Sequence, residues 1–148
     1  MAGNPLVAQG TVNRIRGSLV IPNFPQLNVT APFLGKEGIR LTFQGETTLY
    51  IPTMTGAATS PEPYLQVMIE VDLLKTQNLS SLYKAQQELL ATIGAATLYP
   101  DTSSLPIYNF VNCAIQKTGD LNFAGTTAAY PITIGGLYNI NSSLFNMN

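Results

Sequence analysis

Two carboxylates offer the clearest spacing for chemistry in this chain of 148 residues. Glu70 and Asp72 lie two positions apart, so on an extended strand they would share a face about 7 Å apart, a separation that paired glycosidase carboxylates tolerate. In the sequence near them there is no candidate platform of aromatic residues and no acid whose pKa burial would shift. We therefore expect two solvated charges on the face opposite the core, with hydrolysis by carboxylates alone as the alternative.

The other reactive groups point away from catalysis. Cys113 is the only cysteine and alternates with Val111 and Ile115, so it lies on an apolar face and packs as a small hydrophobic group. The chain has no histidine, which excludes Ser-His-Asp, Cys-His and HExxH mechanisms. Residues 35–38, Gly-Lys-Glu-Gly, lack the spacing of a phosphate-binding loop and predict a turn. We expect no enzymatic activity, no metal and no cofactor.

The composition favours a surface made for contact. Charged residues are 10% of the chain, where a soluble domain usually has about 25%, and apolar residues are 45%. The formal net charge is -1, so no strong positive field attracts nucleic acid or an anionic membrane. Tight sequence-specific binding of DNA is therefore not expected.

No segment resembles a membrane anchor or a secretion signal. No apolar run approaches the 18 or so residues of a membrane span, and residues 1–5, Met-Ala-Gly-Asn-Pro, lack the basic and apolar regions of a signal peptide. We therefore expect a protein made in the cytoplasm and not inserted into a membrane.

Alternation of apolar and polar residues predicts a single β-rich domain over 1–148. The alternation is strictest in 64–74, where apolar residues occupy every second position. Further strands are predicted at 10–21, 39–44, 47–54, 95–99, 111–116 and 129–140. Pro131 and the pair Gly135 and Gly136 indicate that the last strand lies at an edge or contains a bulge.

One segment has helical rather than strand periodicity. Apolar residues recur every three or four positions in 78–94, which predicts an amphipathic helix of about four turns. Asn78 or Ser80 could cap its start, and Gly94 suits the left-handed residue after its end.

Three further segments look like contact elements. Residues 55–63 are nearly uncharged and longer than a tight turn needs, so we expect a projecting hairpin loop. The two ends, 1–9 and 141–148, are too apolar for disordered tails and are expected to be docking arms. The candidate contact residues in these segments are Pro5, Leu6, Val7, Thr55, Gly56, Pro61, Pro63, Leu144 and Phe145.

The order of these parts resembles that of bacteriophage tail tube proteins. The stretches at 53–56, 108–115, 118–126 and 138–144 look like those of contractile-tail phage tubes; they read TMTG, YNFVNCAI, TGDLNFAGT and YNINSSL. The resemblance covers nearly the whole chain. The related tubes of type VI secretion systems and R-type bacteriocins remain open as alternatives.

The resemblance implies a mainly β fold of two packed antiparallel sheets, a sandwich or barrel, flanked by one helix. It also implies hexameric rings that stack into the hollow inner tube of a virion tail, assembled in the host cytoplasm. The implied partners are other copies of the chain, the tail sheath, the baseplate and the tape measure protein. Double-stranded DNA would pass through the tube without specific binding.

A tube that passes DNA should avoid a lining of Lys and Arg, which bind phosphate. The polar face of 64–74, formed by Gln66, Met68, Glu70 and Asp72, is our candidate for the lining. Its two carboxylates would then repel DNA around the ring. Placement of this face on the outside or at an interface is the alternative.

A second function class stays open from the sequence. A small β-barrel could bind a sugar or a peptide on a platform of Tyr50, Tyr64 and Tyr99. Such a binding module would be a monomer, whereas a tube protein would form rings or tubes.

Overall fold

The structure is a computed structural model that describes residues 16–101, 105–119, 121, 123, 126 and 128–143. The predicted N-terminal arm, with Pro5, Leu6 and Val7, lies outside the described residues. So do Leu144 and Phe145 of the predicted C-terminal arm.

Six antiparallel strands form the main sheet, in the order β1-β6-β7-β8-β5-β2. Their bounds are Gly17–Val20 (β1), Leu34–Gln44 (β2), Tyr64–Leu74 (β5), Thr92–Pro100 (β6), Tyr108–Thr118 (β7) and Ala129–Asn139 (β8). The two outer strands, β1 and β2, also contact each other, so the sheet curls round toward a barrel. Short 3-10 helices at Pro25–Leu27 (η1) and Ala31–Phe33 (η2) follow β1. The prediction of a mainly β fold with a helix is confirmed, with one curled six-stranded sheet around the core and a second, small sheet of two strands.

The core lies inside the curl of this sheet. Along β5 the residues Val67, Ile69, Val71 and Leu73 are buried and face inward, as strict alternation predicts. They pack against apolar residues of β1, β6, β7 and β8 and of the segment after β1. Rings of Phe43, Tyr108, Phe110 and Tyr138 contact one another, with centroids 5.5 to 6.3 Å apart.

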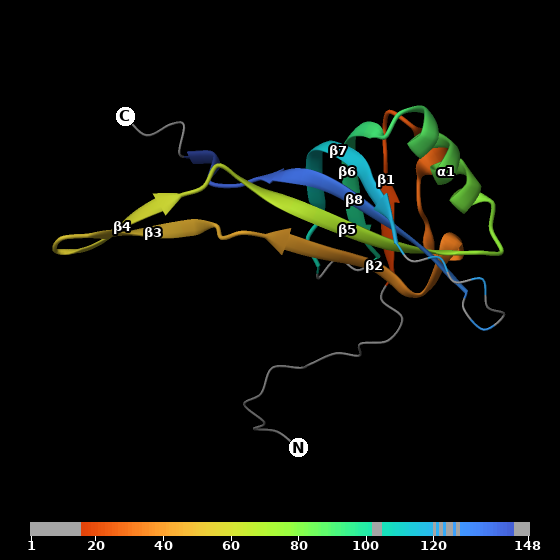
Figure 1. Cartoon of the computed structure of the whole chain (residues 1–148), viewed down its shortest axis with the longest axis horizontal. Coiled ribbons are helices and arrows are strands. Elements are labelled where there is room, and N and C mark those ends of the chain that lie inside the picture. The colour runs from red at the N-terminus through yellow and green to blue at the C-terminus, as the bar shows by residue number, and fades with distance from the viewer. Residues whose placement is uncertain are drawn as a thin grey trace, which may run out of the picture.

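The helix α1, Leu79–Leu89, covers the core at the end that lies to the right in Figure 1. Its buried residues are Leu79, Tyr83 and Gln86. The Tyr83 hydroxyl donates a buried hydrogen bond of 2.7 Å to the Leu27 carbonyl of η1. This bond joins the helix to the segment that follows β1.

The predicted helix over 78–94 is too long at its C-terminal end. The chain is already extended at Leu90, and Gly94 belongs to β6, where its φ of 81° coincides with a shift in the β6–β7 register. The predicted side-chain caps are also wrong, because neither Asn78 nor Ser80 accepts a bond from a free helix N–H. The apolar spacing continued past the helix because Ile93 is a core residue of the following strand.

Of the two alternatives for the last strand, the edge position is wrong, since β8 lies between β7 and β5. An irregular register does occur in its pairing with β7. Pro131 is tolerated because it lies where β7 has ended, and its carbonyl accepts a bond from the Gly119 N–H. The register shifts fall on β7, which has the extra residues. Gly136 makes room for them, because a Cβ there would lie 2.8 Å from the Cys113 Sγ.

A two-stranded ribbon projects from the core. It consists of β3, Thr48–Thr53, and β4, Gly56–Pro61, joined by a turn at residues 54–55, and it extends to the left in Figure 1. The ribbon continues the hairpin of β2 and β5 beyond the main sheet. The projection was predicted, but residues 55–63 are not a loop: 56–61 form a strand, because each residue pairs with β3 in an uninterrupted register.

Candidate assembly surface

The ribbon exposes apolar side chains on a backbone that has no third strand among the described residues. Leu49, Tyr50, Ile51 and Met54 are all more than 40% exposed. Residues 47–61 contain no charged residue, and Glu46 and Glu62 flank them. Natural edge strands are usually protected by charge, by proline or by covering elements. Within the part of the chain that the structure describes, this ribbon has neither charge nor a covering element, and Pro52 and Pro61 are prolines within its two strands.

The four predicted contact residues of this region are all at or near the ribbon. Thr55 lies in the exposed turn, Gly56 begins β4 and Pro61 ends it. Pro63 lies just before β5, and its carbonyl accepts a hydrogen bond from the Ile140 N–H. The structure thus brings the predicted residues onto one projecting element, although two of them are in a strand rather than a loop.

The candidate lining face lies on the outside of the main sheet. Gln66, Met68, Glu70 and Asp72 alternate with the buried residues of β5 and lie on its outer face. The same face continues onto β2, where the Gln44 amide contacts the Met68 sulfur, and onto β8 and β7.

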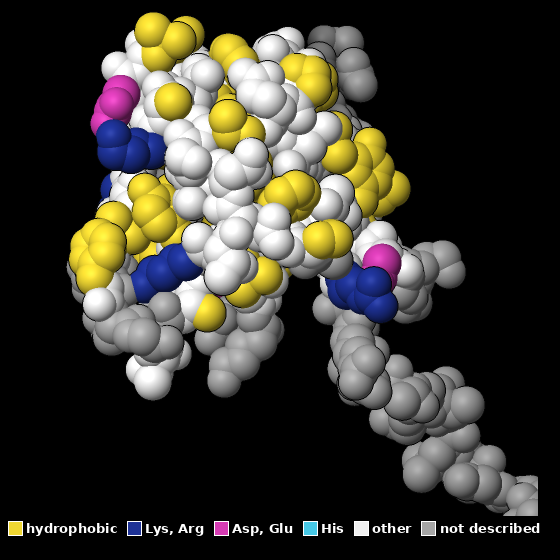
Figure 2. Space-filling model, turned by 90° about the vertical axis from the view of Figure 1, so that its right-hand side faces the viewer, with side chains coloured by type: hydrophobic (Ala, Val, Ile, Leu, Met, Phe, Trp, Pro, Cys, Tyr) yellow, Lys and Arg dark blue, Asp and Glu magenta, His cyan; other side chains and the backbone are white. Residues whose placement is uncertain are grey.

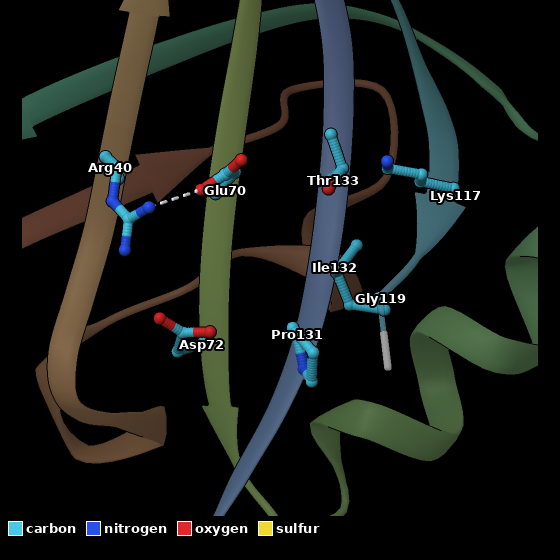
Figure 3. Close-up of a pocket in the computed structure, with 8 residues that line it drawn as sticks. All are labelled: Arg40, Glu70, Asp72, Lys117, Gly119, Pro131, Ile132 and Thr133. Carbon is cyan, nitrogen blue, oxygen red and sulfur yellow. Dashed lines mark hydrogen bonds and ion pairs between the residues drawn. The ribbon is translucent and has the colours of Figure 1, made fainter. Parts of the chain in front are cut away.

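A charged row crosses this outer face. Arg40 pairs in register with Glu70, Glu70 with Thr133 and Thr133 with Lys117, so four neighbouring strands present one row. The Arg40 Nη1 donates a hydrogen bond of 3.0 Å to the Glu70 Oε2. Figure 3 shows this pair, and it shows Asp72 further along the same strand as Glu70. These residues line a pocket of about 360 Å³ together with Gly119, Pro131 and Ile132.

The row adds two cations to the face whose two carboxylates we expected to repel DNA. Arg40 and Lys117 balance Glu70 and Asp72, so these four residues sum to zero charge. Both side chains of the Arg40–Glu70 pair are exposed, at 66% and 36%, so the pair adds about 1 kcal/mol or less to stability. Sequence reasoning missed the contribution of Arg40 and Lys117 because only the strand register places them beside the carboxylates.

The structure places the remaining candidate groups as follows. Cys113 is buried, and burial raises the pKa of its thiol to about 11, which keeps it protonated and unreactive near neutral pH. The three tyrosines of the proposed platform lie on three elements: Tyr50 is on the ribbon, while Tyr64 on β5 and Tyr99 on β6 are separated by two strands. The structure therefore does not assemble that platform.

The surface beyond the ribbon is also poor in charge. Figure 2 views the molecule from the right-hand side of Figure 1 and shows hydrophobic side chains scattered among uncharged ones, with charged side chains in only a few places. Within the described residues there is no group of three or more His, Cys, Asp or Glu that could hold a metal ion. The described part of the chain also has no helix long and apolar enough to cross a membrane.

Comparisons with known proteins complete this description. No family model matches the chain, and no curated protein matches it. Among solved structures, the chain is similar to a cryo-EM structure of the anti-feeding prophage cap, described as the AFP tube terminating cap. The sequence identity is 12%, the match covers 94% of this chain and 95% of that chain, and the TM-score is 0.46.

Proposed function

We propose that this chain is a structural subunit that assembles with copies of itself into stacked hexameric rings, as the inner tube of a phage-type tail. The observation that carries the proposal is the ribbon, which projects its uncharged and apolar surface away from the core. An isolated two-stranded hairpin is at best marginally stable in water. A neighbouring subunit that covers the ribbon would supply the missing contacts.

The main sheet has a width that suits the wall of such a tube. The outer face with the charged row spans four strands, β2, β5, β8 and β7. If six subunits each contribute four strands at about 4.8 Å spacing, the circumference is roughly 115 Å and the backbone diameter roughly 37 Å. That bore leaves room for a DNA duplex after side chains are added. Lining by the outer face is part of the proposal.

The balanced charge of this face supports passage of DNA. Binding of DNA to a protein depends on Lys and Arg that neutralise phosphates and release counterions. In the outer face Glu70 already engages Arg40, so this cation is less available to a phosphate. A lining of this kind would neither hold nor strongly repel the duplex. Sheath, baseplate and tape measure protein remain the proposed partners of the tube.

Removal of the ribbon tests the proposal. Thr47 and Glu62 are already hydrogen-bonded, with the Glu62 N–H donating to the Thr47 carbonyl at 3.0 Å. Joining these two residues through Asn-Gly would close the hairpin with a two-residue turn and delete 48–61. We expect wild-type protein to form stacked rings or hollow tubes in electron micrographs, and the shortened protein to form folded monomers or single rings.

Three results would count against this function. Uniform monomers of the wild-type protein at high concentration would favour the binding module instead. Full-length tubes from the shortened protein would show that the ribbon is not an assembly element. Discrete rings of wild-type protein that never lengthen would indicate a subunit of a terminal or baseplate ring rather than of the tube.

A further inference from the structure

The side chain of Asn141, which follows the end of β8, links the base of the ribbon to the core. The Asn141 Nδ2 donates to the Glu62 carbonyl at 2.7 Å and to the Thr47 carbonyl at 3.1 Å. Glu62 lies in the segment between β4 and β5, and Thr47 in the segment between β2 and β3. One amide group therefore bridges both segments where the main sheet stops and the ribbon starts.

The position of this amide follows from the strand pairing. The ladder between β5 and β8 ends with Tyr64 opposite Asn139, and the Ile140 N–H adds one further bond to the Pro63 carbonyl. Beyond that point the backbone of β8 has left the sheet, and the Asn141 side chain takes over the hydrogen bonding. Both of its partners are carbonyls, which only accept, so its two N–H groups must face them.

The backbone conformation at residue 141 favours asparagine. Its φ of 51° lies in the left-handed region, which Asn tolerates better than most residues. The segment that leads from β2 to β3 begins at Gly45, whose φ is 93°. Without the amide, the ribbon keeps its connection to the core through the two segments of its hairpin, one of which contains this conformationally permissive glycine.

We propose that Asn141 is a positioning residue that fixes the direction in which the ribbon projects from the core. The inference rests on the proposed function, because a ribbon held in one direction is preorganised to meet a neighbouring subunit. If only part of the population has the ribbon in the binding direction, the apparent dissociation constant of assembly rises by the inverse of that fraction.

The test measures the direction of the ribbon in monomers. Spin labels at Met54→Cys, in the ribbon turn, and at Leu89→Cys, at the end of α1, report the distance between ribbon and core by pulsed electron paramagnetic resonance. Both sites are exposed, whereas Cys113 is buried and takes up no label. The measurement is made at a concentration below that of assembly.

Two variants remove the amide in different ways. Asn141→Gly accepts the left-handed backbone and lacks the side chain, and Asn141→Asp keeps the shape but has a carboxylate that cannot donate to the carbonyls. The matched control is Asn112→Gly. Asn112 also has a left-handed backbone, with φ 52°, but lies in β7 away from the ribbon.

We expect a narrow distance distribution for the wild type and for Asn112→Gly, and a broad one for both Asn141 variants. Loss of two hydrogen bonds should lower the population in the fixed direction about tenfold, and the critical concentration of assembly should rise by about the same factor. An unchanged distribution in the folded Asn141 variants would overturn the inference. A broad distribution with unchanged assembly would support the positioning role and instead contradict the role of the ribbon in assembly.

Discussion

The main sheet and the ribbon are both antiparallel β-structure, but they differ in what covers their side chains. In β5 every second residue is buried, and full burial of a Val, Leu or Ile side chain contributes roughly 1.5 to 3 kcal/mol. In β3 and β4 nearly every residue is exposed, including Ile51 at 52%. Side-chain burial therefore stabilises the main sheet, whereas the ribbon has backbone pairing and an apolar surface that is exposed.

The difference separates the part of the molecule that is stabilised by its own packing from the part that we propose contacts a neighbouring subunit. The same β-favouring residue types, Leu, Tyr and Ile, occur in both regions. In the main sheet these side chains pack against residues on the facing part of the curled sheet, whereas in the ribbon they are exposed to solvent. Hydrophobic surface that is left uncovered on a projecting element commonly marks an interaction site.

The largest expected effect compares isoleucines of the two regions. Ile69→Ala in β5 removes a fully buried side chain and should lower the free energy of unfolding by about 2 to 5 kcal/mol. Ile51→Ala in β3 removes an exposed one and should change it by less than about 0.5 kcal/mol. Urea denaturation of both variants measures the contrast, and equal losses would show that the ribbon is part of the cooperative core.

A smaller effect is expected where the helix meets the core. Tyr83→Phe removes the hydroxyl that satisfies the Leu27 carbonyl and should cost about 1 to 3 kcal/mol. Denaturation at neutral pH checks this value, with Tyr50→Phe on the exposed ribbon as the control. A loss no larger than that of the control would mean that the buried bond adds no stability.

The same tyrosine predicts a pH dependence. Burial raises the pKa of the Tyr83 phenol above its ordinary value of about 10, because the charged form is desolvated. The contribution of the neutral phenol to the free energy of unfolding is fully present below a pH of about 10, and it decreases as the pH rises above that value. Above a pH of about 10 the wild type should therefore lose stability with rising pH more steeply than Tyr83→Phe. Parallel curves would contradict the assignment.

The charged row should contribute little to folding but more to the surface potential. Glu70→Gln should lower the free energy of unfolding by about 1 kcal/mol or less, since the pair with Arg40 is exposed. If the face lines a tube, each ring of six gains a charge of +6, because one carboxylate per subunit is lost. Assembled tubes of the variant should then retain DNA at low salt and release it as salt rises.

The control for this experiment is Glu88→Gln. Glu88 pairs with Lys84 on the exposed face of α1. Glu88→Gln therefore removes the same charge as Glu70→Gln, but from the helix instead of the outer face of the sheet. Equal retention of DNA by both variants would indicate a general charge effect and would remove the outer face from the bore.

The smallest effect on folding should accompany a large effect on assembly. Ile51→Ser on the ribbon and Leu90→Ser after α1 remove side chains of similar exposure, 52% and 54%. Neither should change the unfolding free energy by more than about 0.5 kcal/mol. Only Ile51→Ser should raise the critical concentration of tube formation, as measured by sedimentation. Equal effects on assembly would point to unspecific apolar association.

The strands were predictable because their side chains alternate. The bounds of β5 agree with the prediction, and most other strands overlap the predicted ranges. Helix α1 was predictable in position but not in length, because Ile93 continues the helical spacing of apolar residues although it belongs to β6. The ribbon was predictable as a projection from its lack of charge, but the small residues of 56–61 gave no sign of a strand.

The sequence by itself determined the strand faces, the shortage of surface charge and the absence of histidine chemistry, because these depend on residue types and on the two-residue period of a strand. Only the tertiary structure decided which residues meet across strands. Arg40 and Glu70 are 30 residues apart, and Asn141 is 94 residues from Thr47. Such contacts arise from register and strand order, which the burial of the whole core fixes and no local pattern records.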